Sequence, residues 1–178
     1  VFQIDVSRTP TAQGLLPSLA HAGYGQGQVV TSPLKVARVA ASIAAGGVVA
    51  PLRWFVANER PASSSQLSAS SSQSQAATIR FISASHAALL GRAMRDVVTH
   101  GTGRAVRGNS VPIAGKTGTA EIGDGAAHSW FTGFAPYGGS GRRIAFAVVV
   151  ENAGYGARAA APVAGELVTA ARDLELIK

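Results

Sequence analysis

The stretch Val111-Pro-Ile-Ala-Gly-Lys-Thr-Gly-Thr-Ala-Glu-Ile122 decides the fold class of this chain, together with His128-Ser-Trp-Phe-Thr-Gly-Phe134, which follows it after a short glycine loop. Both segments have the length and composition of β-strands, and we predict strands over 111–122 and 129–135. Successive side chains of a strand point to opposite faces, so Thr117 and Thr119 are expected to share one face and to line one groove. Gly118 between them has no side chain, which lets a ligand approach closely along an exposed edge.

Lys116 precedes these hydroxyls and adds a compact positive charge to the same strand. A charge-assisted hydrogen bond from its ammonium to a substrate carboxylate is worth about 1.5 to 3 kcal/mol net. A backbone N–H on such an edge could also stabilise a developing oxyanion, and losing one such donor commonly costs on the order of a hundredfold to a thousandfold in rate. The strand therefore predicts a site for an anionic acyl substrate.

The first half of the chain contains one predicted helix, over residues 33–45. Ser32 supplies a hydroxyl cap, proline stands at the first helical position, and the glycines at 46–47 end the helix in a left-handed conformation. Residues 48–56 are expected to be extended. Residues 61–78 contain eight serines and few groups able to pack, so we predict a flexible surface insertion there.

A second helix is predicted between this serine-rich segment and the strands. It begins at a Ser83 or Ser85 cap and runs to His100, with Gly101 as its terminator. The residues expected on its buried line are Leu90, Met94 and Val97.

The C-terminal part predicts a third strand over 142–150, joined to the second by a hairpin-like turn at 136–141. Because every position of 144–150 is apolar, this strand is expected to be central in the sheet and covered on both faces. A final helix is expected to start near Pro162. The residues expected to pack it on the sheet are Val163, Leu167, Ala171 and Leu174.

Length and charge limit the possible functions. The 178 residues suit one domain, and the absence of cysteine excludes disulfide or thiolate-metal chemistry within the chain. The net charge of +7 is carried by scattered arginines without an aromatic-interleaved basic stripe, so no nucleic-acid partner is predicted. No apolar run approaches the roughly 20 residues needed to span a bilayer, so any membrane anchor is expected to lie outside this chain.

Several blocks of the sequence resemble the transpeptidase domain of class B penicillin-binding proteins. A Lys-Thr-Gly triplet is one element of the signature of penicillin-binding proteins and class A β-lactamases, and the other blocks occur here in the family's order. They are Gly23-Tyr-Gly-Gln-Gly-Gln-Val-Val-Thr-Ser-Pro-Leu-Lys-Val-Ala37 with Ala44-Ala-Gly-Gly47, Val97-Val-Thr-His-Gly-Thr-Gly-Arg-Ala105, Ala114-Gly-Lys-Thr-Gly-Thr-Ala120, Trp130-Phe-Thr-Gly-Phe-Ala-Pro136 and Ala147-Val-Val-Val-Glu-Asn152.

The resemblance implies an α/β (α+β) fold of the serine β-lactamase/transpeptidase type, with an antiparallel sheet flanked by helices. It implies a D,D-transpeptidase that transfers an acyl group from the D-Ala-D-Ala stem of one peptidoglycan strand to an amine on another, and that is acylated by β-lactam antibiotics. Lys116 would orient the site and its proton network. Thr117, Gly118 and Thr119 would contact the substrate, through the threonine hydroxyls and the close approach that Gly118 permits, and the Thr119 N–H would be one oxyanion donor.

The resemblance also implies the partners of the protein and its location in the cell. No cofactor or metal is expected, and the four histidines show no ligand spacing. The expected partners are the peptidoglycan stem peptide, β-lactams, the N-terminal half of the same domain and other cell-wall synthesis proteins. The expected location is the periplasmic face of the inner membrane.

The nucleophile of the family is absent from its expected place. Family members acylate a serine in Ser-x-x-Lys, upstream of Ser-x-Asn, and no Ser-x-Asn occurs here. The single Ser-x-x-Lys, from Ser32 to Lys35, matches a downstream block and suits a helix cap better than a nucleophile. We therefore expect residues 1–178 to be the C-terminal portion of the domain, inactive alone. A β-lactamase-type hydrolase and a non-catalytic penicillin-recognition or scaffolding module remain alternatives.

Two other patterns suggest chemistry but have simpler explanations. Asp124, His128 and Ser129 are the residue types of a catalytic triad, yet adjacent strand residues point to opposite faces, so His128 and Ser129 are not expected to pair. Gly101-Thr-Gly103 lacks the third glycine of a dinucleotide fingerprint and follows a helix, so we predict a turn there.

Overall fold

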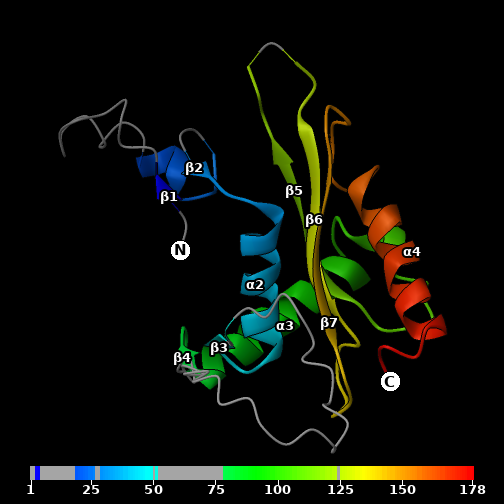
Figure 1. Cartoon of the computed structure of the whole chain (residues 1–178). Helices are drawn as coiled ribbons and strands as arrows, with labels where there is room; N and C mark the ends of the chain where they lie inside the picture. The colour runs from blue at the N-terminus through cyan, green and yellow to red at the C-terminus, as the bar shows by residue number, and fades with distance from the viewer. Residues whose placement is uncertain (1–2, 5–18, 27–28, 50, 52–77, 124) are drawn as a thin grey trace, which may run out of the picture.

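A three-stranded antiparallel sheet forms the centre of the fold, with helices on both faces (Figure 1). The computed structural model describes residues 3–4, 19–26, 29–49, 51, 78–123 and 125–178. The sheet order is β5 (Ala114–Ala120), β6 (His128–Ala135) and β7 (Ile144–Val150). The predicted strands and the mixed α/β class with an antiparallel sheet are confirmed.

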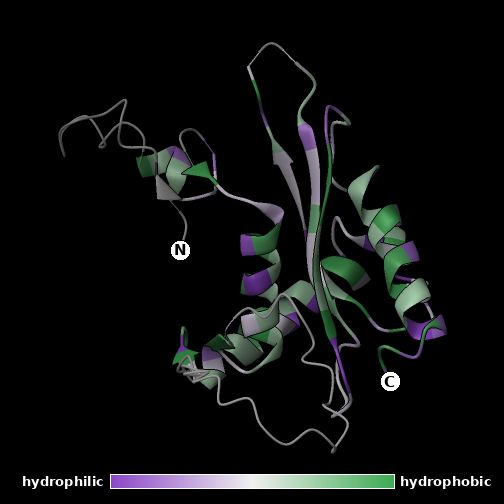
Figure 2. Cartoon of the chain, viewed as in Figure 1, coloured by the Kyte–Doolittle hydropathy of each residue, from purple (hydrophilic) through white to green (hydrophobic). Residues whose placement is uncertain are grey.

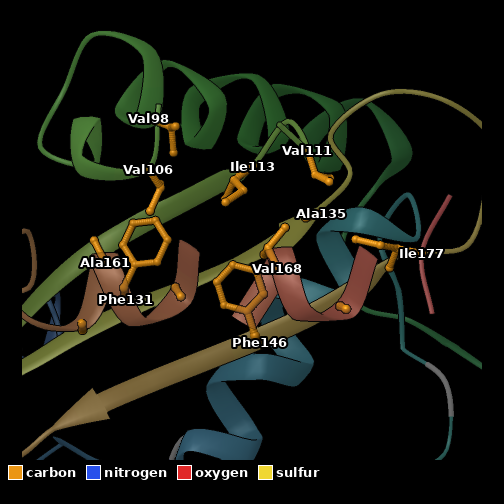
Figure 3. Close-up of a cluster of buried hydrophobic side chains, with 13 residues drawn as sticks. Val98, Val106, Val111, Ile113, Phe131, Ala135, Phe146, Ala161, Val168 and Ile177 are labelled. Carbon is orange, nitrogen blue, oxygen red and sulfur yellow. The ribbon is translucent and has the colours of Figure 1, made fainter. Parts of the chain in front are cut away.

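The two faces of the sheet pack against different helices. Phe131 on β6 and Phe146 on β7 stack with ring centroids 6.2 Å apart, on the face covered by α4 (Ala160–Asp173) (Figure 3). Phe134, three residues after Phe131 and on the other face, packs with Met94 of α3 (Ala84–Thr99) and with Ala114. Because side chains of β6 alternate between the two faces of the sheet, this one strand contributes to two hydrophobic cores, one on each face.

Among the described residues the middle strand is β6, so the prediction that 144–150 form the central strand is wrong for this sheet. Within the described residues β7 pairs only with β6, and Phe146 is its one buried residue. The other half of the prediction is confirmed, because alternate β7 residues contact α4 on one face and α2 (Pro33–Ala44) on the other, which explains the apolar composition. Figure 2 shows the contrast between apolar β7, in green, and β5, which is mostly pale.

Helix α2 (Pro33–Ala44) forms where the cap and the glycines predicted it. The hydroxyl of Ser32 accepts a hydrogen bond from the Lys35 N–H at 3.4 Å, which satisfies one of the free donors of the first turn. Gly46 and Gly47 follow the helix with φ of 67° and 92°, a region that favours glycine. Ser32 therefore acts as a helix cap, as predicted.

Helix α3 (Ala84–Thr99) begins after a Ser83 cap and has His100 as its C-cap, close to the predicted ends. Its predicted buried line is only partly right, because Met94 is buried but Leu90 is 42% exposed and Val97 is half-buried. Small residues face the interior instead, since an added Cβ at Gly91 would already contact Phe134 at 3.7 Å. The buried residues of α3 are Ala87, Gly91, Met94 and Val98.

The predicted packing face of α4 is right only at Ala171, which is buried. Leu167 is 42% exposed and Leu174 is 70% exposed, whereas Val168 is fully buried. Close packing explains why small residues are buried here in place of leucines. A Cβ at Gly165 would lie 3.1 Å from Val106 of the short helix η2 (Arg104–Val106). Small residues on this face let α4 approach η2 more closely than leucines would. The buried residues of α4 are Ala160, Ala161, Ala164, Gly165, Val168 and Ala171.

Two short ladders complete the described fold. Gln3–Ile4 (β1) pairs with Val29–Val30 (β2), and Val48–Val49 (β3) pairs with Ile79–Arg80 (β4). The β3–β4 pairing brings together the two sides of the serine-rich segment, of which 61–77 lie outside the described residues. Most of 48–56, predicted to be extended, also lies outside them, and its described residues Val48 and Val49 form β3. None of the helices in the described part of the chain has the length and apolar character required to cross a membrane.

Candidate functional site at the edge of β5

Strand β5, which carries the Lys-Thr-Gly-Thr sequence, lies at an edge of the sheet. In the described residues it pairs only with β6, in a register that places Thr117 opposite Phe131 and Thr119 opposite Ser129. Both hydroxyl residues therefore share the face that α4 covers, as the alternation predicted. Lys116 lies opposite Thr132, on the other face, so its cation and the two hydroxyls leave the strand in opposite directions.

The Lys116 side chain is exposed and turns back along the edge of its own strand. Its Nζ donates to the carbonyl oxygen of Thr117 at 2.7 Å. This contact places the ammonium at the edge of β5, beside the backbone of the next residue, although the side chain starts on the face opposite the hydroxyls. The edge therefore combines a cation with outward-facing backbone groups.

The backbone direction of Thr119 follows from a second contact. The side-chain Nε2 of Gln26 donates to the Thr119 carbonyl oxygen at 2.9 Å, from outside the β5–β6 ladder. In an antiparallel strand the C=O and N–H of one residue point to the same side. The Thr119 N–H consequently points to the open edge, the orientation that an oxyanion donor requires.

Thr117 has a hydroxyl partner that sequence reasoning missed. Its Oγ1 lies 2.6 Å from the Oγ1 of Thr102, in the predicted turn after α3. The turn is confirmed, because the N–H groups of Gly101 and Gly103 both donate to the Val97 carbonyl at the end of α3. Thr102 is thereby fixed by the helix terminus.

Gly118 lies between close neighbours on both faces of the sheet. An added Cβ would meet the Trp130 Cβ at 3.1 Å on one face. On the other face the backbone of Gly156 presses on the ladder, since a Cβ there would lie 2.5 Å from the Gly118 oxygen and 2.3 Å from the Trp130 oxygen. The Ser129 hydroxyl fixes that loop by donating to the Tyr155 carbonyl at 3.1 Å.

The candidate triad is not assembled. Ser129 is buried, and its hydroxyl accepts from the Ala160 N–H at 3.0 Å as well as donating to Tyr155. His128 lies on the opposite face and accepts a hydrogen bond from the Asn152 N–H at its Nδ1, at 3.0 Å. Asp124 lies outside the described residues. Ser129 is thus a structural hydroxyl that ties β6 to the start of α4.

Other possible ligand sites lie away from this edge. Three cavities, of about 400, 510 and 380 Å³, are bordered respectively by α2 with the β6–β7 hairpin, by α4 with η2, and by α2 with α3. None of their lining residues belongs to β5. Within the described part of the chain, no three His, Asp or Glu side chains gather in a way that could hold a metal ion.

Comparisons with known proteins identify relatives of this chain. A family profile described as "Penicillin binding protein transpeptidase domain" matches residues 7–169. Among solved structures, the chain is similar to the D,D-transpeptidase domain of a peptidoglycan glycosyltransferase from Eggerthella lenta, with 30% identity and a TM-score of 0.59 over 84% of this chain and 34% of that one. It is also similar to Pseudomonas aeruginosa PBP2 in complex with WCK 5153, with 29% identity and a TM-score of 0.64 over 90% and 33% of the two chains.

A third similar structure is an imipenem acyl-enzyme complex of penicillin-binding protein A from M. tuberculosis, with 28% identity and a TM-score of 0.59 over 93% of this chain and 35% of that one. The chain spans about one third of the length of these three structures. Among proteins whose function has been curated, none matches the chain. The likeness to a PBP2 agrees with the class B character of the sequence. On the profile match over most of its length, the chain belongs to the penicillin-binding protein transpeptidase family.

Proposed function

We propose that the protein is part of a D,D-transpeptidase that cross-links peptidoglycan stem peptides through a serine acyl-enzyme and is acylated by β-lactams. The observation that carries this proposal is the outward-facing backbone of Thr119, next to the Lys116 ammonium, on the edge of β5 in a chain of this family. An edge strand with a free N–H can receive an extended peptide and stabilise charge on its carbonyl oxygen.

Each residue of the edge has one role in this proposal. The Thr119 N–H donates to the oxyanion that forms when a serine hydroxyl attacks the carbonyl of D-Ala-D-Ala. Lys116 orients the site and its proton network, and the hydroxyls of Thr117 and Thr119 donate to the carboxylate of the stem peptide or antibiotic. Gly118 presents only backbone between the two threonines, so no side chain obstructs a substrate that lies along the edge.

The nucleophile and the facing wall of the groove come from outside this chain in our proposal. Residues 1–178 form the C-terminal portion of the domain, with 61–78 as a surface insertion, and the N-terminal half supplies Ser-x-x-Lys and Ser-x-Asn. The domain acts at the periplasmic face of the inner membrane, with its anchor also outside this chain, alongside other cell-wall synthesis proteins. Acyl transfer to serine needs no cofactor, because the leaving D-alanine takes up the proton of the hydroxyl.

Mass spectrometry after incubation with penicillin tests the proposal. We expect no covalent adduct on the 178-residue chain, and one adduct per molecule on the polypeptide that also carries the N-terminal half. An adduct on Ser32 of the 178-residue chain would contradict the assignment of the nucleophile. Rapid hydrolysis of the adduct would instead identify a β-lactamase, and a complete polypeptide that is never acylated would identify a non-catalytic module.

A further inference from the structure

We infer that Gln26 is a positioning residue for the oxyanion donor, holding the Gly118–Thr119 segment of β5 in its productive orientation. The inference rests on the proposed function of Thr119 and goes beyond it, because Gln26 itself touches no reacting atom. It starts from one contact, the 2.9 Å hydrogen bond from the Gln26 side-chain amide to the Thr119 carbonyl, which joins segments 93 residues apart.

The part of β5 that needs positioning is the peptide bond between Gly118 and Thr119. The oxyanion N–H belongs to this peptide group, and glycine on its N-terminal side permits more backbone conformations than any other residue. In the described structure no second strand pairs with this edge. The pairing of Gly118 with Trp130 of β6 holds this peptide group on its inner side. On the open side, the orientation of the N–H depends on groups that hold the residues before and after it.

Side chains hold the backbone on both sides of this peptide bond. Before it, Thr117 is held through its carbonyl by the Lys116 ammonium and through its hydroxyl by Thr102. After it, the Thr119 carbonyl is held by Gln26. A donor on the Thr119 C=O restrains the rotation that would also tilt the Thr119 N–H. Gln26 is the holding group on the C-terminal side.

Gln26 is itself fixed by a closed turn. Its backbone N–H donates to the His21 carbonyl at 2.9 Å, and the N–H of Gly23 donates to the Leu19 carbonyl at the same distance. Gly25 adopts a φ of 83°, which completes the reversal of the chain. A half-buried side chain on such a turn has little freedom to leave the Thr119 carbonyl.

The chemistry of an amide suits this position. Nε2 is a neutral donor, so it binds the carbonyl without placing a full charge beside the oxyanion. A carboxylate of the same size would have no donor for the Thr119 carbonyl and would repel the developing negative charge. Gln26→Glu is therefore expected to be more harmful than Gln26→Ala, although it is the closer isostere.

The test separates positioning from folding through the kinetics of acylation. In the complete polypeptide, stopped-flow measurements with a fluorescent penicillin give the noncovalent dissociation constant and the acylation rate constant. We expect Gln26→Ala to lower the rate constant about tenfold, less than the hundredfold to thousandfold typical of deleting an oxyanion donor, and Gln26→Glu to lower it further. The dissociation constant should change less than twofold.

Tyr24→Ala is the matched control, because Tyr24 lies on the same turn, is exposed and has a ring contact with His21. An acylation rate unchanged in Gln26→Ala would overturn the inference. So would an equal loss in Tyr24→Ala, which would show that the turn as a whole matters and not the amide.

A second measurement does not depend on activity. In protein labelled with ¹³C at threonine carbonyls and ¹⁵N at glutamine side chains, NMR should show coupling between the Gln26 amide and the Thr119 carbonyl. Gln26→Ala should shift the Thr119 carbonyl resonance and Tyr24→Ala should not, whereas the absence of such a shift in Gln26→Ala would refute the contact. If wild-type polypeptide is not acylated at all, the proposed function fails while this measurement still decides whether Gln26 holds Thr119.

Discussion

The hydroxyl oxygens of Thr102 and Thr117 lie 2.6 Å apart, at the short end of O–H···O hydrogen bonds. One hydroxyl belongs to the turn after α3 and the other to the edge strand β5. This bond fixes the Thr117 rotamer before any ligand arrives. A hydroxyl oriented in advance loses less rotational freedom on binding a carboxylate.

Removing the Thr102 hydroxyl should therefore weaken carboxylate recognition. Thr102→Val keeps the shape of the side chain, and we expect the complete polypeptide to bind penicillin noncovalently about three- to tenfold more weakly, because a neutral hydrogen bond is worth about 0.5–1.5 kcal/mol net. The stopped-flow dissociation constant measures this. Thr102→Ser retains the hydroxyl and should bind like wild type, so equal effects of the two variants would contradict the explanation.

Lys116 should matter for acylation and little for stability. Its side chain is exposed and donates a hydrogen bond to the Thr117 carbonyl, so Lys116→Ala should change the free energy of unfolding by less than about 0.5 kcal/mol. The rate of labelling by fluorescent penicillin should fall about tenfold to a hundredfold, because a charge-assisted hydrogen bond contributes about 1.5–3 kcal/mol. Labelling at the wild-type rate would exclude Lys116 from the site.

Gly156 should be intolerant of a methyl group. A Cβ at this residue would lie 2.3 Å from the Trp130 carbonyl oxygen, so Gly156→Ala must displace backbone and not a flexible side chain. We expect it to cost about 1–3 kcal/mol and to lower the melting temperature by about 3–10 °C. Gly108→Ala is the control, since a Cβ there meets nothing within 4 Å. Similar melting temperatures for the two variants would refute the close approach of this loop to β5.

Two neighbouring residues of α4 test which face packs on the sheet. Val168 is fully buried and Leu167 is 42% exposed. Val168→Ala should lower the free energy of unfolding by about 1.5–3 kcal/mol, from lost apolar burial and the cavity left behind, and Leu167→Ala by less than about 0.5 kcal/mol. Denaturant unfolding measures both. A larger loss of stability in Leu167→Ala than in Val168→Ala would show that the leucine face packs on the sheet, as hydrophobic periodicity predicted.

These two helices show where sequence reasoning failed. In both α3 and α4 the larger apolar residues, such as Leu90 and Leu167, were expected inside, because burying them removes more surface from water. The structure buries small residues instead, among them Gly91 and Gly165, which lie against Phe134 and Val106. Hydrophobicity ranks single residues, whereas packing depends on how closely two surfaces can approach.

At the candidate site, too, the local features were predicted from the sequence and the long-range contacts were not. The strand, its edge character and the shared face of Thr117 and Thr119 followed from alternation and glycine spacing, which are properties of adjacent residues. The contacts of Thr102 and Gln26 did not follow, although both residues lie within blocks that resemble the family. They are 15 and 93 residues from their partners, and no local pattern encodes a hydrogen bond across such a separation.

The sequence by itself determined the helix cap at Ser32, a second cap at Ser83 or Ser85, the three strands, the family and the residues of β5. Caps, alternation and glycine turns act over a few residues, so they can be read from neighbouring positions alone. Only the tertiary structure decided that β6 lies in the middle of the sheet formed by the described residues, which faces of α3 and α4 are buried, and which side chains hold Thr117 and Thr119. These features depend on surfaces that meet only after the chain has folded, where close packing outweighs the hydrophobicity of any single residue.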